Sequence, residues 1–337
     1  MNYFITGGTG FIGTHLSSLL HEVHPETRIY NLDIVEPGTP LPTVKNYKPA
    51  LGKGEEHAAT FIYCDVRQPI ELEKVNITPD DVIFNFAAVH RTPGHPDPAY
   101  FETNIRGAEN VCAFAERHGI RKIVFTSSIA LYGAAEELKE ETTLPMPNTP
   151  YGISKLVAEK IHQTWQAGGE GRQLTIVRPG VVFGRGENGN FTRLYWGIRG
   201  HKFMYPGRKD TIKACIYVKE LVRFMLYRLE HHDSGVELYN CCYEPAYTIE
   251  HIVESMKRVT NMKVKVPFMP GWLIMTAAGI AGALGSPMGI CPARVRKLQI
   301  STNICGKKLS ASGYRFRYTF EEALADWYKD NGNLYLR

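Results

Sequence analysis

The sequence predicts an α/β fold in which a doubly wound parallel sheet carries a smaller C-terminal lobe. Two observations support this prediction. Short apolar strands alternate with helical patterns through the first half of the chain, which is typical of a parallel sheet covered on both faces. The segments 184–213 and 244–337 are less regular. We therefore expect a sheet domain from residues 1–182 plus 214–243, and a second lobe from 184–213 plus 244–337.

A glycine-rich turn follows the first predicted strand. Residues 2–6 are apolar enough for a buried strand, and apolar residues then recur at helical spacing from 11 to 20. Between them, Gly7 permits a tight turn, Gly10 lets the backbone approach a pyrophosphate, and Gly13 lets the helix pack closely. The start of the helix presents unpaired N–H groups to phosphates. The predicted phosphate-binding residues are Gly7, Gly10, Phe11, Ile12 and Gly13.

The second predicted strand, 28–32, ends in Asp33. A carboxylate at this position accepts hydrogen bonds from both ribose hydroxyls of NAD and repels the 2′-phosphate of NADP. The sequence therefore predicts NAD as the cofactor.

The next elements place further residues at the carboxyl ends of strands, where ligands bind in open α/β sheets. Strands are predicted at 61–66, at 81–88, whose last residues are small, and at 122–128, which ends in hydroxyls. A helix is predicted at 101–118, and a long polar loop at 36–58. The additional cofactor contacts predicted are Asp65, Val66, Phe86, Ala87, Ala88, His90, Asn104, Ser127 and Gly180.

A helix predicted at 151–166 carries Tyr151 and Lys155, and a sixth strand follows at 174–179. Residues four apart share one face of a helix. An ammonium beside a phenol favours the phenolate, so we expect Lys155 to lower the pKa of Tyr151. A phenol of this kind is a suitable proton acceptor for the oxidation of an alcohol.

The composition of the chain narrows the classes of protein to which it could belong. The 337 residues are 44% hydrophobic and 22% charged, with a net charge of +5 and no nucleic-acid-binding motif. The first predicted strand begins at residue 2, which predicts no signal peptide. Seven cysteines without a C-x-x-C pair favour reduced thiols in a cytoplasmic protein. The scattered histidines suggest no metal site.

Residues 272–284 carry no charge and are flanked by lysines and arginines. The segment is too short to span a bilayer. Two interpretations remain open: a buried or interdomain helix, and a helix that contacts the interface of a membrane with Trp272 at the water boundary. In the second, the basic flanks attract an anionic leaflet, here the cytoplasmic face of the inner membrane.

With the glycine turn, Asp33, Ser128, Tyr151 and Lys155 in this order, the chain resembles the extended short-chain dehydrogenase/reductases. Within them it is similar to the NAD-dependent sugar epimerase/dehydratase family, with a Rossmann-type fold. The motifs that carry the resemblance span 6–13, 85–88, 127–133, 151–155, 178–179 and 216–218. The resemblance implies that Tyr151 is the general base and that Lys155 binds the nicotinamide ribose. It further implies that Ser128 orients the substrate hydroxyl, with Ser127 as the runner-up for that role. It also implies a homodimer through helices near 105–118 and 151–166.

The substrate is less defined. Sugar 4,6-dehydratases share a pair of acidic residues directly after the catalytic hydroxyl. In this chain Ser128 is followed by Ile-Ala-Leu, so we do not expect dehydration. UDP-hexose 4-epimerases usually carry an Asn where this chain has Val181, and an Arg where it has Lys213. A late arginine of that family grips the diphosphate, and Arg294, with Arg296 as the alternative, matches it. The predicted substrate residues are Ser128, Lys213, Arg294 and Arg296.

Softer similarities at 87–91, 200–204, 294–298 and 312–313 point to epimerases that act on lipid-linked N-acetylglucosaminyl-diphospho-undecaprenol. We therefore expect 4-epimerisation of a diphosphate-linked N-acetylhexosamine in surface polysaccharide or lipopolysaccharide biosynthesis. A UDP-sugar 4-epimerase and a 4-keto-sugar reductase with net NAD(P)H turnover remain the alternatives.

Overall fold

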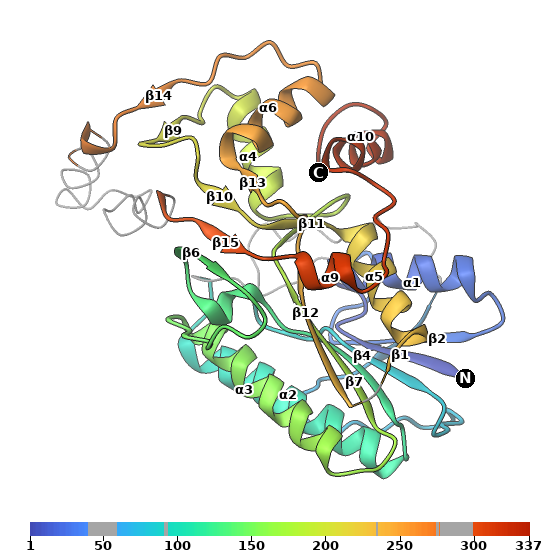
Figure 1. Ribbon diagram of the computed structural model, residues 1–337. Coiled ribbons are helices and arrows are strands. Elements are labelled where there is room, and N and C mark those ends of the chain that lie inside the picture. The colour runs from blue at the N-terminus through green and yellow to red at the C-terminus, as the bar shows by residue number, and fades with distance from the viewer. Residues whose placement is uncertain (40–58, 91–93, 234, 274–275, 277–298) are drawn as a thin grey trace.

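The computed structural model describes residues 1–39, 59–90, 94–233, 235–273, 276 and 299–337. Its centre is a seven-stranded sheet in which every pair of neighbours is parallel, in the order β12-β7-β5-β4-β1-β2-β3 (Figure 1). In chain order the strands are β1 (Asn2–Thr6), β2 (Arg28–Asp33), β3 (Thr60–Tyr63), β4 (Val82–Asn85), β5 (Lys122–Thr126), β7 (Gln173–Pro179) and β12 (Val236–Cys241). Most of the predicted loop at 36–58 lies outside the described residues.

Helices cover both faces of this sheet, so its strands are apolar on both sides. Helices α1 (Phe11–Val23) and α5 (Val218–Glu230) pack together on one face, and α2 (Asp97–Arg117) and α3 (Pro150–Ala167) on the other (Figure 1). Leu16, Leu20 and Phe224 belong to the first core, and Phe114 and Trp165 to the second. The predicted Rossmann-type fold is confirmed.

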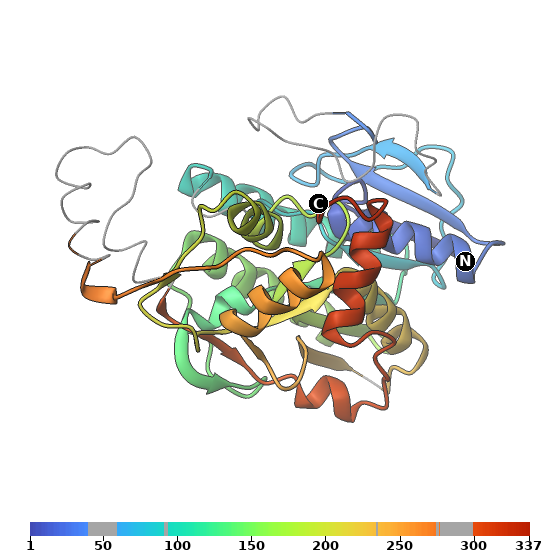
Figure 2. The ribbon, with the colours of Figure 1, turned by 90° about the horizontal axis from the view of Figure 1, so that it is seen from above.

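Smaller sheets accompany the seven-stranded sheet, and three of their strands, β6, β8 and β11, include residues predicted for the sheet domain. One has the order β13-β10-β15-β6, and two further pairs are β8 with β11 and β9 with β14. The strands are β6 (Ala135–Lys139), β8 (Val181–Phe183), β9 (Tyr205–Pro206), β10 (Ile212–Lys213), β11 (Cys215–Tyr217), β13 (Tyr247–Thr248), β14 (Phe268–Met269) and β15 (Thr302–Ile304). Helices α4 (Asn190–Arg199), α6 (Ile249–Val259) and α10 (Phe320–Asp330) enclose a third core around Phe183 and Trp327. Figure 2 shows β14 at one end of the molecule, far from α1.

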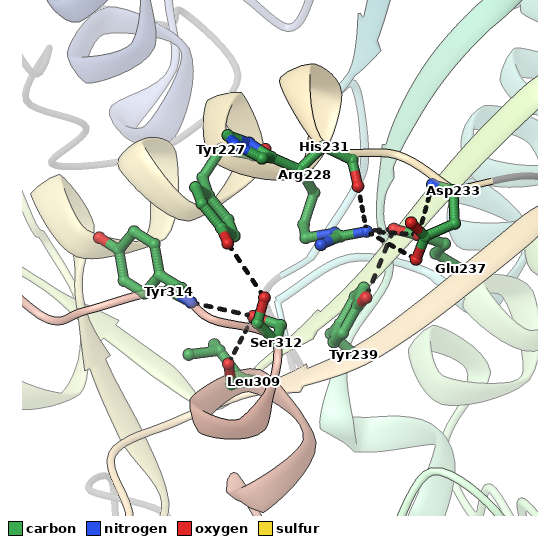
Figure 3. A network of polar contacts seen from close by, with 9 residues as sticks. All are labelled: Tyr227, Arg228, His231, Asp233, Glu237, Tyr239, Leu309, Ser312 and Tyr314. Atoms are coloured by element: carbon green, nitrogen blue, oxygen red, sulfur yellow. Dashed lines mark hydrogen bonds and ion pairs between the residues drawn. The ribbon is translucent and has the colours of Figure 1, made fainter.

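A polar network ties the C-terminal part of the chain to the sheet domain at the amino end of β12 (Figure 3). Arg228 donates two hydrogen bonds to the buried carboxylate of Glu237, and Tyr239 donates a third. Tyr227 donates to the carbonyl of Ser312, just after the short helix α9 (Lys307–Ala311). Because this network lies at the edge opposite the carboxyl ends of the strands, it supports the fold rather than a ligand site.

Candidate active site

The turn between β1 and α1 can accept a ligand only because it lacks side chains. Gly7 has φ +70°, and a Cβ there would lie 2.8 Å from the amide nitrogen of Ala87. A Cβ on Gly13 would lie 2.6 Å from the Cα of Gly8, so the start of α1 packs directly on the turn. Gly10 caps α1 without a side-chain hydrogen bond, which leaves the N–H groups at Phe11 and Ile12 facing a prospective phosphate.

Asp33 lies beside this turn at the end of β2. Its carboxylate accepts backbone hydrogen bonds from Thr9 at 3.2 Å and from Val35 at 3.1 Å. Burial raises the pKa of Asp33 above its ordinary value, and the hydrogen bonds from Thr9 and Val35 oppose that shift. The carboxylate therefore has the position expected for a ribose-binding group. Neither Gly8 nor Thr9 was among the predicted site residues, although both lie inside the motif.

Asp65 follows β3 by two residues, since the strand ends at Tyr63 and not at 66 as predicted. Its carboxylate forms a bidentate ion pair with Arg67, at 2.9 and 2.6 Å, which holds the pKa of Asp65 below its ordinary value. The side chain of Val66 is buried beneath α2, and its carbonyl accepts a hydrogen bond from Asn110. A contact between Val66 and adenine would therefore come from its main chain.

The loop after β4 passes over the glycine turn. Phe86 donates its N–H to Thr6, Ala87 lies against Gly7, and Ala88 continues the loop. Asn104 holds the end of this loop: its amide accepts from Val89 N–H at 2.8 Å and donates to Val89 C=O at 3.1 Å and to Ser154 Oγ at 2.8 Å. The amide is thus engaged within the protein, where its hydrogen bonds hold the loop after β4 against α3.

Two other predicted contacts occupy strand ends. Ser127 is 1% exposed, and its hydroxyl has no hydrogen-bond partner within the described part of the chain. Such an unpaired buried hydroxyl is consistent with a ligand partner. Gly180 follows β7, and a Cβ there would lie 2.6 Å from the carbonyl of Ala214, so this position also requires close backbone packing. His90 is exposed and borders residues 91–93, which are not described.

The predicted catalytic residues come together at the carboxyl end of β5. Ser128 caps a 3-10 turn, η1 (Ile129–Tyr132), and its hydroxyl accepts from the amide of Ala130 at 3.1 Å. Tyr151 lies in the first turn of α3, which Thr149 caps by accepting from Gly152 N–H at 3.1 Å. The Ser128 hydroxyl lies on the side of the Tyr151 phenol, close enough to lower the pKa of that phenol. Partly exposed Ser128 therefore faces the phenol, whereas Ser127 is buried.

Lys155 lies one turn further along α3 and is 2% exposed. Its ammonium stands over the ring of Phe125, with Nζ 4.4 Å from the centroid. On the other helix of this face, the ring of Tyr100 packs against that of Tyr151 at 6.4 Å. The sheet, α2 and α3 together thus enclose the catalytic pair.

The predicted effect of Lys155 on the Tyr151 pKa is wrong for this structure. Burial raises the pKa of Tyr151 above its ordinary value, and only the neighbouring Ser128 hydroxyl opposes this shift. Burial also lowers the pKa of Lys155 to about 7, opposed by the charge of Glu159. Desolvation is the largest cause of both shifts, because both side chains lie where the charged form is disfavoured.

Several buried polar residues next to the catalytic pair were not predicted. His162 stacks on Phe125 with ring centroids 4.1 Å apart, and its ring nitrogens contact Ala158 C=O and the Asn85 amide. Burial lowers the pKa of His162 to about 4. Glu159 and Arg178 form a buried ion pair on the same side of α3. Glu159 could have been found from the sequence, because it follows Lys155 by one helical turn.

The predicted substrate residues are only partly described. Lys213 lies on β10, where its ammonium donates to the carbonyl of Ile300 at 2.8 Å. Burial lowers the pKa of Lys213 to about 8, while the charge of Glu136 opposes the shift. Arg294 and Arg296 lie outside the described residues. Of segment 272–284, the structure describes Trp272, Leu273 and Thr276. Within the described residues, every helix is too short or too polar to cross a membrane.

The fold and site define a dinucleotide-binding protein with a Ser-Tyr-Lys centre. The chain belongs to the NAD dependent epimerase/dehydratase family, whose model matches residues 3–242. The predicted enzyme class, an NAD-dependent epimerase, and the predicted cofactor are therefore confirmed, and the glycine turn, Asp33 and the unpaired Ser127 hydroxyl fit NAD.

The chain is 31% identical over 331 residues to the N-acetyl-alpha-D-glucosaminyl-diphospho-ditrans,octacis-undecaprenol 4-epimerase of Escherichia coli O157:H7, covering 96% of this chain and 93% of that protein. It is 26% identical over 297 residues to UDP-glucose 4-epimerase 3 of Oryza sativa subsp. japonica, covering 79% and 78%. Among solved structures, a UDP-glucuronic acid 4-epimerase from Bacillus cereus in complex with NAD has a TM-score of 0.75 at 19% identity, covering 99% and 97%.

Proposed function

We propose that this protein is an NAD-dependent 4-epimerase of a diphosphate-linked N-acetylhexosamine, interconverting GlcNAc and GalNAc carried on undecaprenyl diphosphate. The observation that carries the proposal is the juxtaposition of the Ser128 hydroxyl, the Tyr151 phenol and Lys155 beside a dinucleotide cradle. The similarity to the Escherichia coli epimerase that is named for a lipid-linked sugar, over 96% of this chain, supports the choice of substrate.

In this mechanism Tyr151 takes the proton of the C4 hydroxyl when the alcohol is oxidised, and returns a proton to the C4 oxygen when the keto carbon is reduced on its other face. Ser128 orients the hydroxyl, because its own hydroxyl already faces the phenol. Lys155, as a cation, stabilises the Tyr151 phenolate. When bound in the cradle, NAD⁺ supplies a hydride acceptor and a positive ring that favours the phenolate. The phenolate needs that help, since burial alone raises the pKa of Tyr151.

Replacing Tyr151 by Phe tests the proposed chemistry. The variant loses the proton carrier but keeps the ring that packs on Tyr100, so turnover should fall at least 100-fold with NAD⁺ affinity largely unchanged. Tyr227→Phe is the matched control, because it also removes one hydroxyl, at the opposite edge of the sheet. Near-normal epimerisation by Tyr151→Phe would exclude Tyr151 as the base.

The proposal also specifies the group to which the sugar is attached, undecaprenyl diphosphate rather than UDP. Lys213, with Arg294 or Arg296, would bind the diphosphate. Segment 272–284 would contact the membrane interface, and Phe268, Trp272 and Leu273 are 51%, 72% and 41% exposed. Exposed aromatic and aliphatic side chains of this kind suit a membrane interface.

A side-by-side assay separates the carriers. Purified enzyme is given UDP-N-acetylglucosamine or polyprenyl-diphosphate N-acetylglucosamine, and the epimerised sugar is measured. We expect conversion of the lipid-linked substrate; brisk conversion of the UDP-sugar alone would replace the proposal with a UDP-sugar 4-epimerase. Steady accumulation of NADH absorbance during turnover would instead identify a keto-sugar dehydrogenase, because epimerisation has no net redox change.

We also propose a homodimer formed through α2 and α3. Ile153 and Val157 follow one another by a helical turn on α3 and are 39% and 36% exposed. Exposed aliphatic residues at this spacing are suited to helix packing against a second copy. Light scattering should give twice the chain mass, and Ile153→Glu should give the monomer mass.

A further inference from the structure

Behind the catalytic pair, α3 and β7 are joined by a fully buried ion pair. Glu159 is 0% exposed and Arg178 is 4% exposed. Arg178 donates from Nε to Glu159 Oε1 at 2.8 Å and from Nη2 to Glu159 Oε2 at 2.6 Å. Two parallel bonds of this length fix both the distance and the angle between the helix and the strand.

The same guanidinium reaches the turn that carries Ser128. Arg178 Nη1 donates to the hydroxyl of Tyr132 at 2.6 Å, and Tyr132 is the last residue of η1, the turn that Ser128 caps. The Tyr132 hydroxyl donates in turn to Asn240 on β12 at 3.0 Å. A single connected set of hydrogen bonds therefore joins the helix of Tyr151 and Lys155 to the turn of Ser128.

Among the charged side chains, Glu159 has the largest influence on the pKa of Lys155. Glu159 follows Lys155 by one turn of α3, and its negative charge opposes the burial that lowers the pKa of Lys155. From β5, the ring of Phe125 faces the ammonium. His162, on the same helix, stays neutral because burial keeps its pKa at about 4.

Two further ionisable side chains lie near Lys155, those of Arg178 and Tyr151. Arg178, from β7, has its charge directed at Glu159 rather than at Lys155. Tyr151, on α3, is kept neutral in the unliganded protein by burial, which raises its pKa. The carboxylate of Glu159 is thus the group whose loss would change the ionisation of Lys155.

A buried ion pair is a poor source of stability, because desolvation cancels much of the attraction between the charges. Replacing a buried ion pair by well-packed apolar residues is often neutral or stabilising. We therefore look for a role of the Glu159 charge and its hydrogen bonds other than stabilising the fold.

We propose that Glu159 and Arg178 are positioning residues of the catalytic centre: the pair aligns α3 with the Ser128 turn, and the buried Glu159 carboxylate, one helical turn from Lys155, favours the charged form of that lysine. The inference rests on the roles proposed above for Ser128, Tyr151 and Lys155. It assigns two separable effects, one to the charge of Glu159 and one to the Arg178–Tyr132 hydrogen bond.

The charge effect is tested by measuring where Lys155 loses its proton in the cofactor-free protein. Urea unfolding of the protein with and without the substitution Lys155→Met is followed from pH 5 to 9.5, and the pH at which their stability difference begins to change reports the Lys155 pKa. In the Glu159→Gln background, we expect this pH to fall by at least one unit. An unchanged pH would overturn the inference.

Because Glu159→Gln leaves Arg178 buried without a full partner, the double variant Glu159→Leu/Arg178→Met provides a second background in which the whole ion pair is removed. The same shift is expected there, and an unchanged pH would again overturn the inference.

The geometric effect is tested with Tyr132→Phe, which removes the hydroxyl but keeps every charge. We expect kcat to fall about tenfold with the Lys155 ionisation unchanged, whereas a shifted ionisation with normal kcat would contradict the separation of the two effects. The proposed function fails independently, if Tyr151→Phe remains active. If Tyr151→Phe is inactive but Glu159→Gln leaves the Lys155 pKa unchanged, only the present inference is refuted and the proposed function stands.

Discussion

Lys155→Met should stabilise the fold at neutral pH, by an amount that decreases as the pH rises. The pKa of Lys155 is lowered from 10.5 to about 7 by burial. A difference of about 3.5 units corresponds to roughly 5 kcal/mol, at about 1.4 kcal/mol per unit. The contact between the ammonium and the Phe125 ring offsets about 1 kcal/mol, so about 4 kcal/mol remains.

The sign follows from proton uptake. The folded-state pKa lies below the unfolded one, so between pH 7 and 10.5 the unfolded chain binds more protons and stability increases with pH. Below pH 7 the cost of burying the charged lysine is fully present, and above 10.5 it is absent. The stability advantage of Lys155→Met should therefore be largest near pH 6 and should decline by about 3 kcal/mol between pH 7 and 9.5.

Urea denaturation followed by tryptophan fluorescence measures this difference, with Lys160→Met as the matched control. Lys160 lies on the same helix but is exposed, and its ammonium contacts only Gln163 among the hydrogen bonds of the described residues. Its replacement should change stability by less than about 0.5 kcal/mol at every pH. A Lys155→Met effect that is constant from pH 6 to 9.5 would refute the lowered pKa.

Three further substitutions test the cofactor cradle. Gly13→Ala should weaken NAD⁺ binding at least tenfold by calorimetry, because the new Cβ would lie 2.6 Å from Gly8; unchanged affinity would contradict the close packing. Asn104→Ala should lower the free energy of unfolding by about 1–3 kcal/mol, since it leaves the N–H and C=O of Val89 unpaired, and a neutral effect would show that water replaces the amide. Asp33→Asn should narrow the preference for NAD⁺ over NADP⁺ in competitive binding, and an unaltered ratio would remove Asp33 from the ribose site.

The parts of the site that could be predicted depend on short-range spacing. The strand, turn and helix of residues 2–23, Asp33 at a strand end, and the Tyr151–Lys155 pair are each defined within a few residues, and the structure places them as expected. The family pattern added Ser128, which faces Tyr151. Local sequence is sufficient here because the geometry of one turn or one helical repeat fixes the arrangement.

Long-range pairing was not predictable in the same way. Strand β6, with the sequence Ala-Glu-Glu-Leu-Lys, has residues that favour helices, yet it forms the edge of the second sheet by pairing with β15. It also lies within 1–182, the segment predicted for the sheet domain. Tertiary pairing with a strand more than 160 residues away in the chain overrides the local preference.

The ionisation of the catalytic pair was the clearest error. Spacing correctly placed Lys155 on the face of Tyr151, but the direction of a pKa shift depends on burial, which spacing does not report. Lys155 is 2% exposed and sits against an aromatic ring, so desolvation dominates. The compensating carboxylate, Glu159, is fixed by Arg178 on a strand that begins after the helix ends.

Stability and catalysis therefore make opposite demands on the inner face of α3. The second half of that face carries Trp165 in the apolar core, whereas the first half buries Lys155 and Glu159, whose desolvation disfavours folding. An apolar replacement of Glu159 and Arg178 should fold at least as stably as the native chain. It would leave Lys155 without the negative charge that opposes its loss of a proton, and Ser128 without its link to the helix. If the variant Glu159→Leu/Arg178→Met is both more stable and less active, the ion pair is retained for the chemistry of the site and not for the fold.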